Sequence, residues 1–282
     1  MATHLAAVFL AQGQRFEIQS RSTPNPGPGE LLIAVKSVAL NPADGIMRKD
    51  GRFISKYPTI IGFDVSGLVL EVGDGVPTGD DVASGISFHP GITHVAAYAA
   101  WIWKASDPDY GVFQERCLVP WQHSVPLPDD NMSWNEAVAL SVAVQVALSA
   151  WDGLGFPRQW GTPASTDAGP IEKPYDEATN PKEALLIWGA SFSVGTMGVQ
   201  SVRLMRENSN SLIAAVYATA GSANKSYIAS LGADRVFDYK DPSVVDAITS
   251  AAKEDELVIR HCYLATRQLA PCQAVLKSFS QL

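Results

Sequence analysis

Hydrophobic and polar residues alternate over short segments in the first half of the chain, and Gly and Pro residues separate these segments. Clear cases are ELLIAVKSVAL at 30–40, DVSGLVLEVGD at 64–74 and FQERCLVPWQHSVPLP at 113–128. Alternation over about four to eight residues between turn residues is typical of half-buried strands. The first half of the chain therefore predicts a small β-rich domain.

Apolar residues at helical spacing occur in SWNEAVALSVAVQVALSAW, residues 133–151. Ser133 followed by Glu136 matches a capping box, which marks the start of a helix. Residues 153–182 are rich in Gly, Pro, Thr and Asp and show no periodicity, which predicts a loop or linker. A connecting helix and a linker therefore separate the two halves of the chain.

Strand-like and helix-like segments alternate after residue 182. The strand-like segments, such as ALLIWGA and LIAAVYATA, are apolar throughout, as expected for strands that are covered on both faces. This order predicts an α/β fold with a doubly wound parallel sheet, in which we count about four strands. The predicted division is a β-rich domain with the start of the connecting helix at 1–152, the linker at 153–182 and the sheet domain at 183–282.

Composition and charge narrow the classes of function. The chain has 282 residues, of which 46% are hydrophobic and 18% are charged, and this balance is typical of a soluble globular protein. The net charge of -8 and the lack of a Lys/Arg cluster argue against a nucleic-acid partner. Cys117, Cys262 and Cys272 are too few and too far apart for a disulfide framework, which indicates a reducing, cytoplasmic compartment.

One apolar segment, ITHVAAYAAWIW at 92–103, lies among turn-rich residues. It is too short to cross a bilayer, so we expect no membrane attachment. We interpret this segment as an apolar interruption of a loop-rich region.

A glycine-rich turn follows the first apolar strand of the second half, in ALLIWGASFSVGTMGVQ. A strand that ends at Trp188 and turns tightly into a helix directs the unpaired N–H groups of the first helical turn at an anion such as a pyrophosphate. Glycine at 189 and 195 permits close approach of phosphate oxygens, and Gly198 permits close helix–strand packing. The alternative is an ordinary β-turn-α unit, whereas a Walker loop is excluded because no Gly-Lys-Ser/Thr closes the turn. The predicted dinucleotide contacts here are Gly189, Ala190, Ser191, Ser193, Val194 and Gly195.

The end of the second apolar strand indicates which dinucleotide binds. A site for NAD carries Asp or Glu here to bind the ribose hydroxyls, but no acid occurs between Val216 and Ser226. Ser222, Asn224 and Lys225 occur instead, and a cation with polar donors suits a 2'-phosphate. We therefore predict NADPH as the cofactor, with a solvated Lys225 as the alternative.

Several segments together resemble one known family. ALNPADGIMR, YPTIIGFDVSGLVLEVGDGV, IWGASFSVGTMGVQ and SLGADRVFDYKDP occur in the order and approximate spacing of the medium-chain dehydrogenase/reductases. The resemblance is to the zinc-free quinone reductase and enoyl reductase branch, and most of all to the stand-alone, trans-acting enoyl reductases of fungal secondary metabolism. It implies an N-terminal GroES-like β-barrel domain followed by a Rossmann domain.

The resemblance also implies roles for particular residues. Asn41 is expected near the nicotinamide, with Asp44 and Asp64 nearby, and these three are the candidate catalytic residues. Tyr239 is expected near the adenosine end of the cofactor, with a core tyrosine as the alternative. The positions at which zinc-dependent relatives carry metal ligands hold residues such as Phe63, so no metal is expected. The reaction implied is hydride transfer to an enoyl thioester or a quinone, with a polyketide synthase as a partner.

Some positions depart from the family pattern. Ile46 and Val146 stand where close relatives often carry Lys and Thr. The complete sheet of the family has six strands, so the fourth, ELVIRHCY at 256–263, is expected to leave unpaired the edge that forms the dimer in relatives. A non-catalytic NADP-binding remnant or interaction protein is therefore the alternative function, and a methyltransferase-like domain is a weaker candidate.

Overall fold

The computed structural model describes residues 2–79, 85–128, 132–156, 182–208 and 213–280. These residues form two compact units, Met1–Val142 and Ala143–Leu282. Helix α3 (Ser141–Gly153) begins with the last two residues of the first unit and continues into the second.

The N-terminal unit is built on an antiparallel sheet of five strands in the order β6-β3-β4-β5-β7. Their bounds are β3 (Glu30–Ala39), β4 (Asp64–Val72), β5 (His94–Tyr98), β6 (Arg116–Pro120) and β7 (Ser124–Pro126). A separate antiparallel pair and short helices complete the unit: β1 (Thr3–Phe9), β2 (Phe16–Ser22), α1 (Pro42–Asp50), η1 (Pro108–Tyr110), η2 (Trp121–His123) and α2 (Trp134–Val138). Alternate residues of β3, β4 and β5 fill one apolar core, which confirms the β-rich domain.

The interpretation of residues 92–103 as an interruption of a loop region is wrong. Residues 94–98 form β5, which pairs with β4 on one side and with β7 on the other. Val95 and Ala97 lie in the core, and Trp101 is fully buried with its indole N–H 2.9 Å from Thr59 Oγ1. The segment is apolar because it crosses the interior of the domain.

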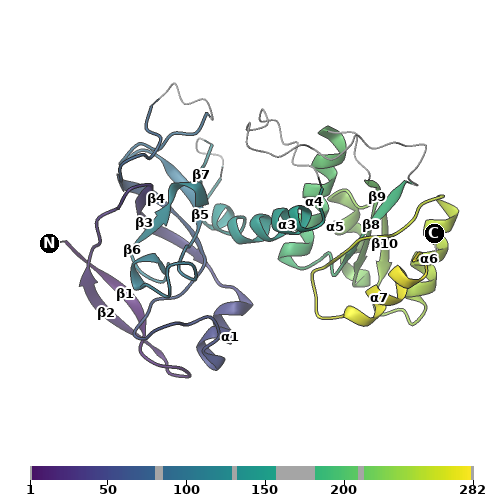
Figure 1. Cartoon of the computed structure of the whole chain (residues 1–282), viewed down its shortest axis with the longest axis horizontal. Helices are drawn as coiled ribbons and strands as arrows, with labels where there is room; N and C mark the ends of the chain where they lie inside the picture. The colour runs from purple at the N-terminus through teal and green to yellow at the C-terminus, as the bar shows by residue number, and fades with distance from the viewer. Residues whose placement is uncertain (1, 80–84, 129–131, 157–181, 209–212, 281–282) are drawn as a thin grey trace. The chain divides into compact units, whose positions relative to one another are not determined.

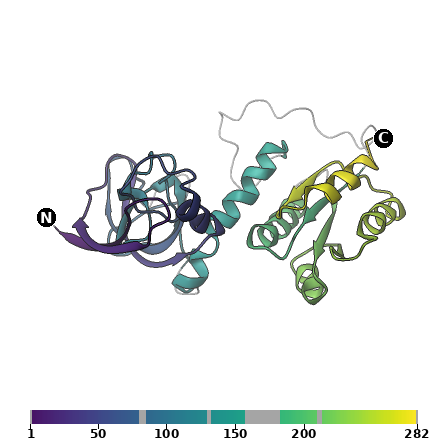
Figure 2. The ribbon, with the colours of Figure 1, turned by 90° about the horizontal axis from the view of Figure 1, so that it is seen from below.

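The second unit is an α/β domain with a parallel sheet of four strands among the described residues, in the order β10-β9-β8-β11. The strands are β8 (Glu183–Trp188), β9 (Ile213–Ala220), β10 (Arg235–Asp238) and β11 (Cys262–Leu264), and the helices are α4 (Ser193–Asn208), η3 (Ser222–Asn224), α5 (Lys225–Ser230), α6 (Val244–Glu254) and α7 (Leu269–Lys277). Helices α4 and α5 lie on one face of the sheet, and α6 and α7 lie on the other (Figure 1 and Figure 2). The expected doubly wound parallel sheet is confirmed.

Strand β8 shows how this sheet is buried on both faces. Leu185 and Ile187 pack with α4 and α5, whereas Leu186 and Trp188 pack with α6 and α7. The fourth strand is shorter than the predicted 256–263, because only Cys262–Leu264 pairs continuously with β8.

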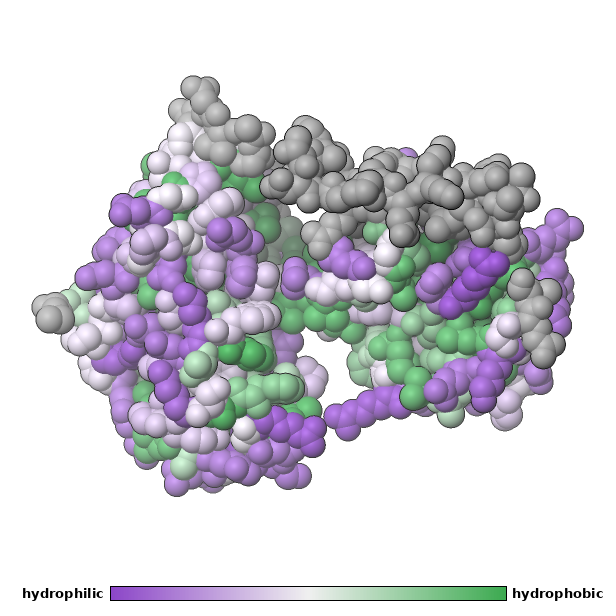
Figure 3. All heavy atoms as spheres, in the orientation of Figure 1, coloured by the Kyte–Doolittle hydropathy of each residue, from purple (hydrophilic) through white to green (hydrophobic). Residues whose placement is uncertain are grey.

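Polar residues cover much of the visible face of the N-terminal unit, with smaller apolar patches between them (Figure 3). Among the described residues, no helix has the length and apolar character needed to span a membrane. The largest buried side chains, among them Trp101, Trp188 and Tyr217, belong to the interiors of the two units.

Two stretches of backbone lie close together at Gly73, just after β4. A Cβ atom at Gly73 would lie 1.8 Å from the carbonyl oxygen of Gly27, and backbone atoms cannot yield as a flexible side chain does. We expect Gly73→Ala to lower the free energy of unfolding by about 1–3 kcal/mol, measured by urea denaturation. Gly45→Ala in α1, where a Cβ meets nothing within 4 Å, is the control and should stabilise by about 0.5–1 kcal/mol. Equal stability of the two variants contradicts this account.

Candidate active site and cofactor cradle

The turn between β8 and α4 is formed mainly by backbone atoms. The Gly189 N–H donates to Thr219 Oγ1 at 2.9 Å, and the Ala190 N–H donates to the Thr219 carbonyl at 2.8 Å. Gly189 has a φ of 85°, and a Cβ there would lie 2.1 Å from Thr266 Cγ2. A Cβ at Gly195 would lie 2.4 Å from the Gly189 carbonyl oxygen. The turn therefore requires glycine at both positions.

The first turn of α4 presents unpaired donors. Among the described residues, the backbone N–H groups of Ser193, Val194 and Gly195 have no hydrogen-bond partner. Gly198, one turn further on, lies against the Tyr263 ring, and a Cβ atom at Gly198 would be 2.9 Å from that ring. A long helix with a positive dipole end, free N–H groups and a tight glycine turn fits a pyrophosphate. The six residues predicted for this contact lie together in this turn.

The residues predicted for the 2'-phosphate lie at the carboxyl end of β9. Ser222, Asn224 and Lys225 are exposed in η3 and at the start of α5. The Tyr239 ring, from the end of β10, lies close to Gly221, since a Cβ there would be 3.7 Å from the ring. The ends of β9 and β10 therefore bring these predicted residues into one region.

Sequence reasoning missed a second cation in this region. The Lys240 ammonium lies 5.8 Å from the centre of the Tyr239 ring. The sequence signal for Lys240 was its position directly after Tyr239 at a strand end. Lys225 and Lys240 therefore follow the ends of two neighbouring strands, with Asp238 and Asp241 on either side of the Tyr239-Lys240 pair.

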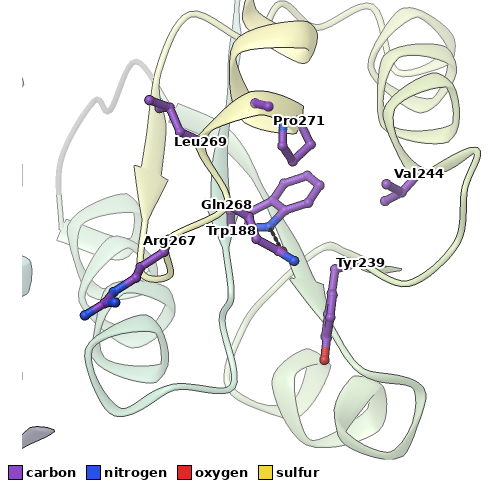
Figure 4. Close-up of a pocket in the computed structure, with 8 residues that line it drawn as sticks. Trp188, Tyr239, Val244, Arg267, Gln268, Leu269 and Pro271 are labelled. Atoms are coloured by element: carbon purple, nitrogen blue, oxygen red, sulfur yellow. Dashed lines mark hydrogen bonds between the residues drawn. The ribbon is translucent and has the colours of Figure 1, made fainter.

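A cavity of about 420 Å³ opens at the carboxyl ends of β8, β10 and β11 (Figure 4). Its lining includes Trp188, Tyr239 and Leu269, and the Trp188 indole N–H donates to Gln268 Oε1 at 2.8 Å. The Arg267 side chain points away from Trp188. From β8 the chain first adds β9 and β10 on one side of this strand and later adds β11 on its other side. Ligands of such sheets bind at the carboxyl ends of the strands where the strand order reverses. Only Tyr239 of these lining residues was predicted from the sequence.

Asn41, Asp44 and Asp64 form one hydrogen-bonded cluster in the N-terminal unit. The Asn41 backbone N–H donates to Asp44 Oδ2 at 2.7 Å, so Asp44 caps the first turn of α1. The Asn41 side-chain amide donates to Asp64 Oδ2 at 2.8 Å. The Val142 N–H donates to the other Asp64 oxygen at 2.7 Å. The structure therefore brings together the three residues that the family resemblance implied.

The two carboxyl groups of this cluster are buried, with 7% of Asp44 and 4% of Asp64 exposed. Burial raises the pKa of Asp44 to about 6; the Asn41 N–H opposes this and the Asp64 charge adds to it. Burial also raises the pKa of Asp64, against its bonds from Asn41 and Val142. Asp44 Oδ1 is buried with no partner among the described residues. The cluster thus supplies a fixed amide and a carboxyl group that gains or loses a proton near pH 6.

The described residues contain no group of three His, Cys, Asp or Glu side chains placed to hold a metal ion. Phe63, at one of the positions where zinc-dependent relatives carry a ligand, packs against the core of the N-terminal unit. Val146, in place of the expected Thr, is 40% exposed on α3.

The sequence is similar to an established domain family and to named fungal proteins. The alcohol dehydrogenase GroES-like domain matches residues 27–129. The trans-enoyl reductase tazE of Aspergillus terreus is 38% identical over 98% of this chain and 82% of its own length. The trans-enoyl reductase tndF of Aspergillus flavipes is 35% identical over 97% of this chain and 71% of its own length. This chain belongs to the trans-enoyl reductase family. The predicted membership of the medium-chain dehydrogenase/reductases is therefore confirmed.

Solved structures show the fold of this family. An alcohol dehydrogenase superfamily protein from Novosphingobium aromaticivorans has a TM-score of 0.66 and 18% identity, over 96% of this chain and 76% of the other. A quinone oxidoreductase from Coxiella burnetii has a TM-score of 0.57 and 16% identity, over 99% of this chain and 88% of the other. The predicted fold class, a GroES-like domain with an α/β domain, is thus confirmed. The relatives support an oxidoreductase.

The buried Asp44 carboxyl predicts how stability depends on pH. Its pKa is about 6 in the folded protein and ordinarily 3.8, so the folded state holds this proton more tightly, and the resulting stability is lost as pH rises through 6. We expect Asp44→Asn to be about 2 kcal/mol more stable than the wild type at pH 8 in urea unfolding, with a smaller gap at pH 4.5.

Asp241 is the control for this experiment because it is an exposed aspartate whose pKa is lowered by bonds from Ser243. Asp241→Asn should give no stabilisation at pH 8. A gap for Asp44→Asn that stays constant between the two pH values contradicts the assignment of a buried, readily protonated carboxyl.

Proposed function

We propose that this protein transfers a hydride from NADPH to an activated C=C bond, that of an enoyl thioester, without zinc. The observation that carries the proposal is the glycine turn before α4, with its free N–H groups at 193–195, in a chain of the trans-enoyl reductase family. A quinone is the second candidate acceptor, because quinone oxidoreductases share the fold. Three cysteines without disulfides support a cytoplasmic location.

The preference for NADPH over NADH rests on the residues at the ends of β9 and β10. Lys225 and Lys240 supply two cations, and Ser222 and Asn224 supply polar donors. The chain has no acid between Val216 and Ser226 that would bind a ribose 2'-hydroxyl and repel a phosphate. We therefore assign the 2'-phosphate to this region and the adenosine end to the side of Tyr239.

In this mechanism the nicotinamide supplies the hydride when the cofactor is bound. The Asn41 amide would contact the nicotinamide, and Asp64 holds that amide in position through the 2.8 Å bond. Hydride adds to the β-carbon of the enoyl thioester, and Asp44 supplies the proton that the α-carbon then takes up. Its pKa of about 6 permits it to gain and lose this proton near neutral pH. Each of these steps uses groups that the fold holds in fixed positions before substrate binds.

The family resemblance favours an acyl chain carried by a polyketide synthase as the natural substrate. The alternative is an NADP-binding protein without turnover, which the absence of Lys at 46 and Thr at 146 favours. Cofactor binding without reduction of any enoyl thioester or quinone would support the alternative.

The first test concerns the cofactor. We expect Lys225→Ala to weaken NADPH binding about tenfold and to leave NADH binding nearly unchanged, because only NADPH carries the 2'-phosphate. The measurement is a fluorescence titration of each nucleotide. Lys253→Ala, an exposed lysine of α6, is the control and should alter neither affinity. Equal weakening of both nucleotides by Lys225→Ala would place the phosphate elsewhere.

The second test concerns the reaction. The wild type should oxidise NADPH with crotonyl pantetheine thioester and form one butyryl thioester per NADPH, at a rate that dialysis against a chelator does not change. Asn41→Ala should lower kcat/KM about 10²-fold because the reacting groups lose their alignment. Asn135→Ala, an exposed amide of α2, is the control. A wild type that binds NADPH but reduces neither thioester nor quinone refutes the proposed activity.

A further inference from the structure

The face of the five-stranded sheet that carries Asp64 also carries Tyr98, a residue to which no function has been assigned above. Asp64 on β4 pairs directly with Tyr98 on β5. Directly opposed residues of antiparallel strands project to the same face, with Cβ atoms about 4.5–5.5 Å apart. Val65 and its partner Ala97 lie in the core, so Asp64 and Tyr98 lie on the opposite face of the sheet.

The Tyr98 ring is held by its neighbours. It stacks on the His123 ring, with centroids 4.1 Å apart and an angle of 13° between the planes. The Trp103 ring lies steeply inclined to both, with its centroid 6.0 Å from that of Tyr98 at 69° and 5.7 Å from that of His123 at 71°. These contacts fix the ring, and therefore the hydroxyl, before any substrate binds.

The Tyr98 hydroxyl itself is unused. Within the described parts of the chain it has no hydrogen-bond partner, although the residue is half-buried. The Tyr98 hydroxyl oxygen is not among the fully buried unpartnered atoms of the described residues, so it is open to solvent and accessible to a ligand. By contrast, the Tyr110 hydroxyl of the same unit donates to Glu30 Oε1 at 2.6 Å. Burial raises the pKa of Tyr98, so this phenol remains protonated and able to donate at neutral pH.

We propose that Tyr98 is a further substrate-contacting residue, whose hydroxyl donates a hydrogen bond to the carbonyl oxygen of the enoyl thioester. This inference rests on the proposed function. When hydride adds to the β-carbon, the C=C electron pair moves toward the carbonyl and the oxygen gains negative charge as an enolate. The Tyr98 O–H bond stays intact and stabilises that charge, and the α-carbon takes its proton from the carboxyl cluster beside it.

The placement of Tyr98 suits this role. Its cross-strand partner Asp64 accepts a hydrogen bond from the Asn41 amide. Tyr98 is therefore the direct strand neighbour of the cluster assigned to the reaction. A fixed donor adds more to a transition state than a mobile one, because no reorganisation is needed as charge develops. The stack on His123 supplies this rigidity without occupying the hydroxyl.

The experiment compares the wild type with Tyr98→Phe, which keeps the ring and its stacking and removes the hydroxyl. With crotonyl pantetheine thioester and NADPH, we expect kcat to fall about 10²-fold, while KM and the Kd for NADPH change by less than about threefold. Tyr57→Phe, whose ring packs on Phe9 in the same unit, is the control and should behave as the wild type.

A second readout needs no turnover. Acetoacetyl pantetheine thioester ionises to an enolate that carries charge on the oxygen in question. We expect Tyr98→Phe to bind this probe about tenfold more weakly in calorimetry and to lose its enolate absorbance. Replacement of Tyr98 by 3-fluorotyrosine retains the hydroxyl and should keep kcat within about threefold, which separates the hydroxyl from the packing of the ring.

Unchanged kcat and unchanged probe affinity in Tyr98→Phe overturn the inference. Equal losses in Tyr98→Phe and in the 3-fluorotyrosine protein also overturn it, because the effect then follows the ring. A wild type that reduces no thioester refutes the proposed function instead, so the two failures are distinguishable.

Discussion

The hydrogen bonds that satisfy the buried Asp64 carboxylate hold the candidate site together. One oxygen accepts from the Asn41 amide and the other from the Val142 backbone, so a single side chain joins the loop before α1, the start of β4 and the start of α3. A buried carboxylate without such partners would be expelled or protonated. The positions of Asn41 and Asp44 therefore depend on Asp64, and the face of the sheet that displays Tyr98 begins at the same residue.

Sequence patterns predicted the parts of the fold in which consecutive residues determine the local structure. The β8 strand, its glycine turn and α4 follow one another within 26 residues, Glu183 to Asn208, and the apolar run and the glycines reveal them. The Asn41–Asp64 bond joins residues 23 positions apart and no periodicity reveals it. Only the family resemblance placed these residues in one site. Tyr98 was missed altogether because its place depends on the pairing of β4 with β5.

Two strands show why single-sequence patterns fail. In β5, Val95, Ala96 and Ala97 are all buried, so the alternation that marks a half-buried strand is missing. In the segment before β11, the buried Glu183 accepts from Arg260 and from His261, at 3.0 Å each. Adjacent residues that reach the same partner depart from the geometry of an extended strand, in which neighbouring side chains point to opposite faces. The continuous strand expected over 256–263 is therefore interrupted.

In the turn after β8, backbone atoms and two glycines determine the local structure more than most side chains do. Its free donors are main-chain amides, and its shape depends on glycines at 189 and 195 and on Thr219. Between these glycines, Ala190 is fully buried in the core, whereas Phe192 is 58% exposed and Ser193 is exposed as well. Such a turn tolerates sequence drift at its exposed positions, 192 and 193. Consensus signatures that prescribe those positions will therefore overlook descendants that keep the same backbone turn.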